Sequence, residues 1–168
     1  MKKLLLILLC LPMIGFGQNV YIPDANFKAY LVGNTAINTN GDTEIQVSEA
    51  TAFTSQMWWN NLSILDLTGI ESFTNLDLLG CGGNQLTSLD ISSNTALTYL
   101  ICDDNQLSSL DLNGATSLTN LSCEYNQLTS IDLSSNTALT QLSCRYNQLT
   151  SLDLSSNIAV YDLICNHK

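Results

Sequence analysis

The sequence contains little basic charge and almost no histidine. Its 168 residues include five lysines and arginines against 15 aspartates and glutamates, and a single histidine, His167. So large an acidic excess repels nucleic acids and anionic membrane surfaces, which are therefore not expected as partners. Catalysis is not expected either, because nothing in the sequence brings a histidine, a carboxylate pair or a cluster of metal ligands to one pocket.

Long hydrophobic runs are also absent, apart from one at the amino end. This run extends from Leu4 to Ile14, follows two lysines and precedes glycines at 15 and 17. The pattern is typical of a bacterial secretory signal peptide, so we expect residues 1–17 to be removed and the chain to be exported. No later apolar stretch approaches the roughly 18 residues that span a bilayer, so membrane insertion of the mature chain is not expected. Three basic residues remain in it against 15 acidic ones, a net charge of −12.

A period of 21 residues dominates the sequence from residue 76 onward. Each unit, for example LTQLSCRYNQLTSLDLSSNIA, contains the phrase LxC and the phrase LDL, with isoleucine in place of one leucine in some units, and in both phrases apolar and outward-facing positions alternate. The alternation predicts two short parallel strands per coil, one on each wall. One coil cannot bury its apolar face alone, but stacked coils share a continuous core. The repeats consist of an atypical first unit and then regular ones, at 62–75, 76–96, 97–117, 118–138, 139–159 and, in part, 160–168.

These units resemble the leucine-rich repeats of the nested 21-residue type, LxxLxCxxNxLxxLDLxxNxx, found on exported proteins of Bacteroidetes-like bacteria. The resemblance covers 62–168 and implies a leucine-rich repeat solenoid with short parallel strands on one or both walls and few helices. It also implies a secreted or surface protein of a Gram-negative-like bacterium that binds a protein or cell-surface ligand without catalysis. The alternative is a structural spacer, or a fragment of a larger surface adhesin that calcium stabilises.

One cysteine recurs at the same position of every regular unit and of the partial last one. In a stack these side chains form a single file, with neighbours separated by the strand spacing of roughly 4.8 Å. A file cannot place four ligands around a metal ion. Neighbouring β-carbons are slightly too far apart for disulfides, and an odd number of cysteines cannot all pair. We therefore expect reduced, buried side chains that act as small hydrophobic residues, at Cys81, Cys102, Cys123, Cys144 and Cys165.

Asparagines form two further columns. In the first, the side-chain amides are expected to bond backbone groups of the turn, which is the role of the asparagine ladder in the family that the repeats resemble. The second column contains Asn94, Asn136 and Asn157, but Ala115 stands between the first two, so a local gap is predicted there. The first column consists of Asn84, Asn105, Asn126 and Asn147.

Several surface positions vary from repeat to repeat. Rigid repeat proteins carry recognition on such positions, and tyrosines beside charged residues are typical of a binding face. The alternative is a solvated surface without a ligand. The predicted binding face consists of Tyr99, Asp103, Asp104, Glu124, Tyr125, Arg145 and Tyr146.

Aspartates form an outward column on the other wall, at Asp90, Asp111, Asp132 and Asp153, and Asp66 is a candidate to extend it. Like charges on neighbouring strands repel each other. Weak calcium binding along the column could offset the repulsion, but we favour hydrogen bonds from side chains such as Ser88 and Ser130, together with screening by solvent.

Residues 18–61 do not repeat and are predicted to form a small helical cap over the first coil. Phe27, Tyr30 and Leu31 have helical spacing after Pro23, a residue that the first helical position tolerates. Trp58 and Trp59 are both expected to pack between the cap and the coil, and the alternative is that they form a platform for a sugar.

The segment NTNGDTEIQVSE at 38–49 resembles a calcium-binding EF-hand loop, although Thr43 stands where that loop has glycine. The alternative is a polar turn whose Ser48 and Glu49 begin a helix. Carried over by position, the resemblance implies Ca²⁺ ligands at Asn38, Asn40, Asp42, Glu44, Gln46 and Glu49.

The last phrase, VYDLICNHK, stops inside a strand and turn without a polar capping unit. An uncapped coil exposes a strand edge and apolar side chains. The sequence therefore predicts end-to-end self-association through this coil.

Overall fold

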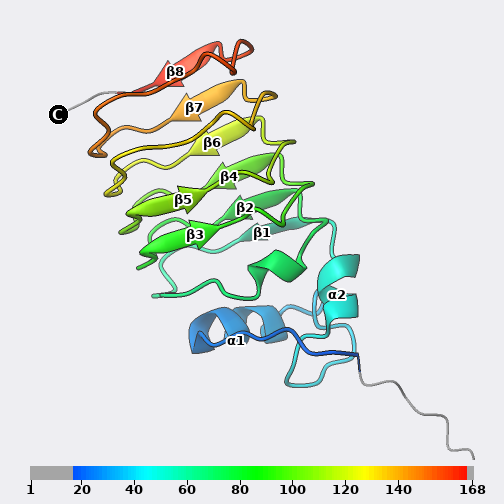
Figure 1. Ribbon diagram of the computed structural model, residues 1–168. Coiled ribbons are helices and arrows are strands. Elements are labelled where there is room, and N and C mark those ends of the chain that lie inside the picture. Colours follow the sequence, from blue (N-terminus) through cyan, green and yellow to red (C-terminus); the bar gives the residue numbers. More distant parts are fainter. Residues whose placement is uncertain (1–16, 166–168) are drawn as a thin grey trace, which may run out of the picture.

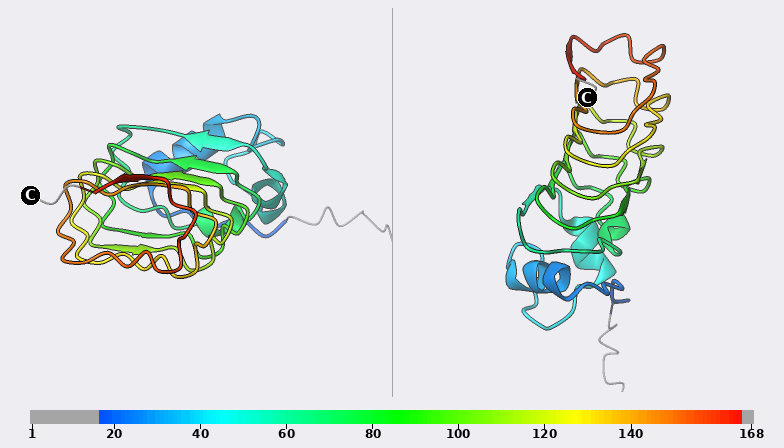
Figure 2. Two further views of the ribbon diagram at one scale, coloured as in Figure 1. Left: turned by 90° about the horizontal axis from the view of Figure 1, so that it is seen from above. Right: turned by 90° about the vertical axis from the view of Figure 1, so that its left-hand side faces the viewer.

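The computed structural model describes residues 17–165, and in it the chain forms a stack of coils on a small helical region (Figure 1). The signal peptide predicted at 1–17 lies outside the described residues, apart from Gly17. Seen from above, successive coils lie over one another as flattened loops (Figure 2), so residues at one repeat position form columns. This architecture confirms the predicted solenoid of short parallel strands with few helices.

Two parallel sheets line the walls of the stack. The smaller sheet contains only β3 (Ser88–Asp90) and β5 (Ser109–Asp111). The equivalent phrases at 130–132 and 151–153 form no strand, so the second wall has strands in two coils and not in every coil. The larger sheet has six strands in the order β1 (Gln56–Trp58), β2 (Leu78–Gly80), β4 (Tyr99–Ile101), β6 (Asn120–Ser122), β7 (Gln141–Ser143) and β8 (Asp162–Ile164).

The sequence period sets the register of the larger sheet. From β2 onward, each residue pairs with the one 21 positions later, as Leu79 does with Leu100. The first coil is one residue longer, because Met57 of β1 pairs with Leu79. The central residue of each of these strands points into the core, where Met57, Leu79 and Leu100 are fully buried. Leu163 in β8, the last strand of the described sheet, is 47% exposed.

The first coil begins earlier than the sequence indicated. β1 lies inside the segment 18–61 that we assigned to the cap, because its phrase, QMW, does not resemble the later repeats. The tryptophans at its end have different environments: Trp59 is 3% exposed and Trp58 is 51% exposed. Successive residues of a strand face opposite sides. Only Trp59 therefore packs between the cap and the coil, and the expectation for Trp58 was wrong.

A carboxylate begins the first helix of the cap, α1 (Ala25–Gly33). Asp24 accepts hydrogen bonds from the backbone N–H groups of Asn26 and Phe27, both at 2.9 Å. We expected Pro23 to be the first helical residue, but it lies outside the helix, because the Asp24 side chain takes the capping position.

The second helix, α2 (Val47–Ala52), starts with a capping box between Gln46 and Glu49. The first coil is tied to α1 through Trp59, whose ring lies 5.4 Å from that of Phe27 and 4.7 Å from that of Tyr30. Both helices of the cap are far too short to cross a bilayer, and the rest of residues 17–165 contains no helix that could.

Candidate functional site

The outer face of the larger sheet forms a continuous surface across the coils. On each strand, the residues before and after the buried central residue point outward. Between coils they line a groove of about 240 Å³. The sequence analysis placed only Tyr99 of this groove in the binding face, and the alternation around each buried leucine identifies the others as outward-facing residues but not as a groove. The outward residues that line the groove are Tyr99, Ile101, Asn120, Ser122, Gln141, Ser143, Asp162 and Ile164.

Side-chain hydrogen bonds link the coils along this face. The Asn120 amide donates to the side-chain oxygen of Gln141, and the Gln141 amide donates to Asp162 at 3.4 Å. Asp103 accepts from the Ser122 hydroxyl and from the Glu124 backbone N–H, both at 2.7 Å. Burial raises the pKa of Asp103 above its ordinary value. Such contacts hold the surface side chains in fixed orientations.

A charged and aromatic cluster lies in the turns that follow β6 and β7. The Arg145 guanidinium donates to both carboxylate oxygens of Glu124, at 3.0 and 3.1 Å. The rings of Tyr125 and Tyr146 stack with centroids 4.2 Å apart and an interplanar angle of 17°. Arg145 lies 6.0 Å from the centroid of the Tyr146 ring. The structure thus brings four residues of the predicted binding face together, and we call Glu124, Tyr125, Arg145 and Tyr146 the turn cluster.

The two tyrosines of the turn cluster have an uncommon backbone conformation. Their φ angles are 51° for Tyr125 and 54° for Tyr146, in the left-handed region, and Asp104 has 53° at the same repeat position. Side chains other than glycine adopt this region at a cost of roughly 1 to 2 kcal/mol. The bend directs both rings outward, and each is nearly half exposed.

The first asparagine column holds this bend in place. In one coil, the Oδ1 atom of Asn126 accepts from the Leu107 backbone N–H at 2.9 Å. Its Nδ2 atom donates to the backbone carbonyls of Cys102, Cys123 and Glu124, at 3.0 to 3.2 Å. Asn84, Asn105 and Asn147 make corresponding contacts. The surface turns are therefore tied to the buried backbone.

The second asparagine column is interrupted at Ala115, which is fully buried. Asn136, in the following coil, donates to the backbone carbonyls of Leu112 and Ala115. At the interruption the turn lies directly against the coil before it: a Cβ atom on Gly114 would lie 1.5 Å from the Ser92 carbonyl oxygen. The glycine at 114 is thus required by this close approach.

The cysteine file contains one disulfide, between Cys144 and Cys165, whose Cα atoms are 5.2 Å apart. We expected all the file cysteines to be reduced, and for this pair the expectation was wrong. The spacing of strand backbones does not fix the separation of β-carbons just beyond the strand ends, and this Cα distance lies within the usual disulfide range of roughly 4.4 to 6.8 Å.

The other thiols of the file, Cys81, Cys102 and Cys123, are free and buried. Burial raises the pKa of Cys81 and of Cys123 to about 12, and that of Cys102 well above its ordinary value. A thiol that stays protonated is a poor nucleophile. These side chains therefore act as part of the core.

The loop at 38–49 is organised around Glu49. One carboxylate oxygen of Glu49 accepts from the N–H and hydroxyl of Thr39 and from the N–H of Asn40, and the other accepts from the N–H of Gln46. Burial alone would raise the pKa of Glu49, but the hydrogen bonds from Gln46, Thr39 and Asn40 outweigh it and lower the pKa. Both oxygens that would hold an ion are thus engaged by the loop.

The other predicted calcium ligands also contact protein groups. Asn40 donates to the side chains of Asp42 and Gln46, and Gln46 donates to Asp42. The Asn38 amide donates to the backbone carbonyls of Val32 and Asp42. The side chain of Glu44, predicted to bind through its carbonyl, forms an ion pair of 2.7 Å with Lys28 outside the loop.

The arrangement of these groups does not form a cage of oxygens. The left-handed bend of the loop falls at Gly41 and not at Thr43, where an EF-hand loop turns sharply. Within residues 17–165, no three histidine, cysteine, aspartate or glutamate side chains gather as a metal site requires. Calcium binding stays a prediction that the contacts of this loop do not support.

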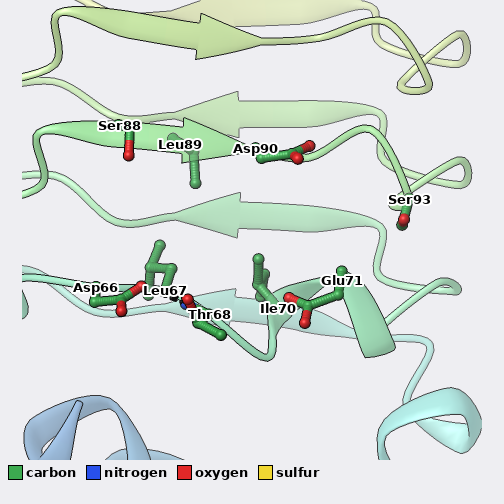
Figure 3. A pocket seen from close by; sticks show the side chains of 9 residues that line it. All are labelled: Asp66, Leu67, Thr68, Ile70, Glu71, Ser88, Leu89, Asp90 and Ser93. Atoms are coloured by element: carbon green, nitrogen blue, oxygen red, sulfur yellow. Dashed lines mark hydrogen bonds between the residues drawn. The ribbon is translucent and has the colours of Figure 1, made fainter. Parts of the chain in front are cut away.

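The aspartate column borders a hollow of about 400 Å³ between the first two coils of the second wall (Figure 3). Its carboxylates are engaged in local turns: Asp90 accepts from the Ser92 N–H at 2.9 Å, and Asp66 accepts from the N–H and hydroxyl of Thr68. The main-chain N–H two residues later is thus the partner, and not the Ser88 or Ser130 side chain that we expected. Asp111, Asp132 and Asp153 make the same contact in their own coils.

Comparisons with known proteins agree with this architecture. No protein-family model and no curated protein matches the sequence. The functional domain of InlJ from Listeria monocytogenes, which includes a cysteine ladder, matches with a TM-score of 0.78 and 41% identity, over 88% of this chain and 33% of that one. The internalin InlF from Listeria monocytogenes str. 4b F2365 matches with a TM-score of 0.55 and 21% identity, over 89% of this chain and 52% of that one.

The chain folds as a leucine-rich repeat solenoid. It spans about a third of the InlJ domain and about half of the InlF structure. The InlF match supports the fold alone. The InlJ match extends to a shared feature, since this leucine-rich repeat chain carries its own column of cysteines through the stack.

Proposed function

We propose that the chain is a non-enzymatic recognition module that binds a protein partner through the outer face of its larger sheet. The turn cluster carries this proposal. Tyrosine and arginine are the residue types enriched at the energetic centres of protein interfaces. Here two tyrosines and an arginine lie in one exposed cluster next to the groove of the sheet.

Fixed side chains support recognition because binding then costs little conformational entropy. The ion pair between Arg145 and Glu124 holds one side chain, and the tyrosine stack holds two others. Around them the face carries Asp103, Glu124 and Asp162. A partner with a basic patch would complement these carboxylates.

The location of the chain outside the cell is also part of the proposal. The apolar run at Leu4 to Ile14 supports export to the cell surface or the medium, and the likeness to the functional domain of InlJ supports a role in recognition. A Bacteroidetes-like, Gram-negative-like source stays a prediction.

Site-specific photocrosslinking tests the recognition face. A photoreactive phenylalanine analogue would replace Tyr146 in one version of the full chain and Tyr21 in a control version. Tyr21 is 74% exposed and lies in the cap, away from the sheet face. Incubated with cells from the habitat of the producing bacterium, the first version should form a discrete crosslinked product that excess unlabelled chain suppresses. Equal products from both versions, or none that unlabelled chain suppresses, would favour a structural spacer.

Self-association through the last coil is a further part of the proposal. Along β8, Leu163 is 47% exposed and Ile164 is 38% exposed, and the nearby Tyr161 is 76% exposed. A strand edge next to exposed apolar side chains favours pairing with a second copy. Sedimentation velocity should show a concentration-dependent dimer that Leu163→Lys abolishes.

A further inference from the structure

A second hollow lies at the amino-terminal end of the sheet face, away from the turn cluster. It is open, and its volume is about 640 Å³. Apart from glycines and the buried Asn84, the residues that line it are one aromatic, one aliphatic and four polar residues: Trp58, Ile101, Asn60, Asn61, Asp103 and Asp104.

The hollow exists because one coil lacks side chains where the next has them. Three glycines, at 80, 82 and 83, occupy the repeat positions that Ile101, Asp103 and Asp104 occupy one coil later. A Cβ atom on Gly80 would meet the Trp58 ring, so the indole lies where that side chain would otherwise be. The glycine-rich phrase GCGG thus leaves a depression in the otherwise continuous face.

The geometry shows how the indole is held. Three adjacent carbons of the Trp58 ring, Cε3, Cδ2 and Cζ3, lie 2.7, 2.9 and 3.1 Å from the point where a Cβ on Gly80 would be. Such similar distances place that point above the face of the ring, since a point in the ring plane would lie much closer to one carbon than to its neighbours. One face of the indole therefore covers Gly80. Because Trp58 is 51% exposed, the other side is accessible to a ligand.

Polar groups surround this aromatic surface. Within residues 17–165, the side chains of Asn60, Asn61 and Asp104 form no hydrogen bond, and Asp103 uses one carboxylate oxygen while the other has no partner. Amides and carboxylates of this kind can bond adjacent hydroxyl groups as both donors and acceptors. A flat apolar surface with a few convergent polar groups is typical of a small-ligand site.

We propose that this hollow binds an uncharged hexopyranose, whose flat C–H face stacks on Trp58 while its hydroxyl groups bond the surrounding amides and carboxylates. Asp103 and Asp104 disfavour sialic acids and uronic acids, because they would repel the carboxylate of such a ligand. The proposal does not rest on protein recognition through the turn cluster, which shares no residue with the hollow, although Asp103 also contributes charge to the proposed recognition face.

Saturation-transfer difference NMR and calorimetry on the full chain test the proposal. The probes are the methyl β-glycosides of glucose and galactose, methyl α-mannoside and, as a charged control, glucuronic acid. At least one neutral glycoside should bind saturably at millimolar concentration and shift the tryptophan emission to the blue, while glucuronic acid should not bind. Absence of saturable binding by all three glycosides, or binding of glucuronic acid at equal strength, would overturn the proposal.

Substitutions locate the site. Trp58→Ala should weaken glycoside binding by at least about tenfold, and buried Trp59 remains as a fluorescent reporter of the fold. Asp104→Gly removes a polar contact at a backbone position that glycine suits, so this second variant should fold normally and still bind less well. Tyr21→Ala, which removes an exposed aromatic residue of the cap, should bind as the unaltered chain does. Unchanged affinity in both Trp58→Ala and Asp104→Gly would also overturn the proposal.

Discussion

Tyr125 and Tyr146 stack face to face across two coils, with ring centroids 4.2 Å apart, although each has a positive φ angle. The stack is worth about 0.5 to 1.5 kcal/mol, and relief of the left-handed backbone by glycine is worth roughly 1 to 2 kcal/mol. The loss of the stack and the relief of the backbone change the free energy of unfolding in opposite directions by similar amounts. Replacing one ring should therefore change binding more than stability.

We therefore predict that Tyr146→Gly leaves the free energy of unfolding within about 1 kcal/mol of the original value and removes the competitor activity of the chain. Urea titration measures the first effect, and competition in the photocrosslinking assay measures the second. Tyr161→Gly, at an exposed tyrosine outside the turn cluster, is the control and should still compete. A Tyr146→Gly chain that competes as well as the original would show that the turn cluster is not the recognition site.

The first asparagine column predicts that the loss of one side-chain amide destabilises the folded chain. Asn126→Ala removes one acceptor and one donor that serve four backbone groups of two coils, so it should cost about 1 to 3 kcal/mol. The neighbouring Gln127 is exposed, and Gln127→Ala should cost less than about 0.5 kcal/mol. Urea unfolding midpoints of the two variants would distinguish the structural role of Asn126 from that of an exposed neighbour. Equal midpoints would show that water replaces the amide without cost.

Two glycines should respond to alanine in opposite directions. Gly114→Ala places a Cβ atom 1.5 Å from the Ser92 carbonyl oxygen, so the turn must move and the chain should lose about 1 to 3 kcal/mol or more. Gly33→Ala, at the end of α1, meets nothing within 4 Å and should gain up to about 1 kcal/mol. Thermal unfolding of both variants is the measurement. Similar shifts would show that the close approach at Gly114 relaxes easily.

Thiol counting tests the cysteine file. Under denaturing conditions without reductant, alkylation should modify Cys81, Cys102 and Cys123 and spare Cys144 and Cys165. After reduction all of them should react. The Cys165→Ser variant should add Cys144 to the thiols that react without reductant. Peptide mapping that finds Cys144 and Cys165 alkylated before reduction would contradict the disulfide.

The contacts of Glu49 in the loop at 38–49 predict how the stability of the chain depends on pH. The pKa of Glu49 is lowered in the folded chain, so its contribution to stability is present above its ordinary value of 4.5 and declines as pH falls through the lower folded value. Glu49→Gln should cost about 1 to 2 kcal/mol at neutral pH and reduce this loss of stability in acid. The cost should be the same with millimolar calcium or with chelator, since the structure assigns Glu49 to loop amides. A larger cost in calcium would instead support the EF-hand prediction.

Periodicity explains which parts of the fold were predictable. A repeat of 21 residues identifies the inward leucines and the columns of asparagine and cysteine, because stacking converts sequence period into spatial alignment. It says nothing about the first coil, whose β1 phrase is unlike the others. It also cannot separate Trp58 from Trp59, since their environments depend on the exact start of β1.

The candidate site was predictable only in part. Variation between repeats located the turn cluster, but not the groove residues Asn120, Ser122 and Gln141, which are polar like any exposed residue. The Cys144–Cys165 bridge depends on side-chain positions beyond the strand ends, which strand spacing does not determine. Contacts of this kind depend on three-dimensional packing and not on local pattern.

The disulfide also decides how the molecule would respond to mechanical load. Cys144 and Cys165 close a covalent loop that contains most of the last coil, including β8. A force applied beyond Cys165 would pass through the sulfur bridge to Cys144 and bypass that loop. The residues within this loop would thus be shielded from tension, and extension under load would come from the chain outside residues 144–165.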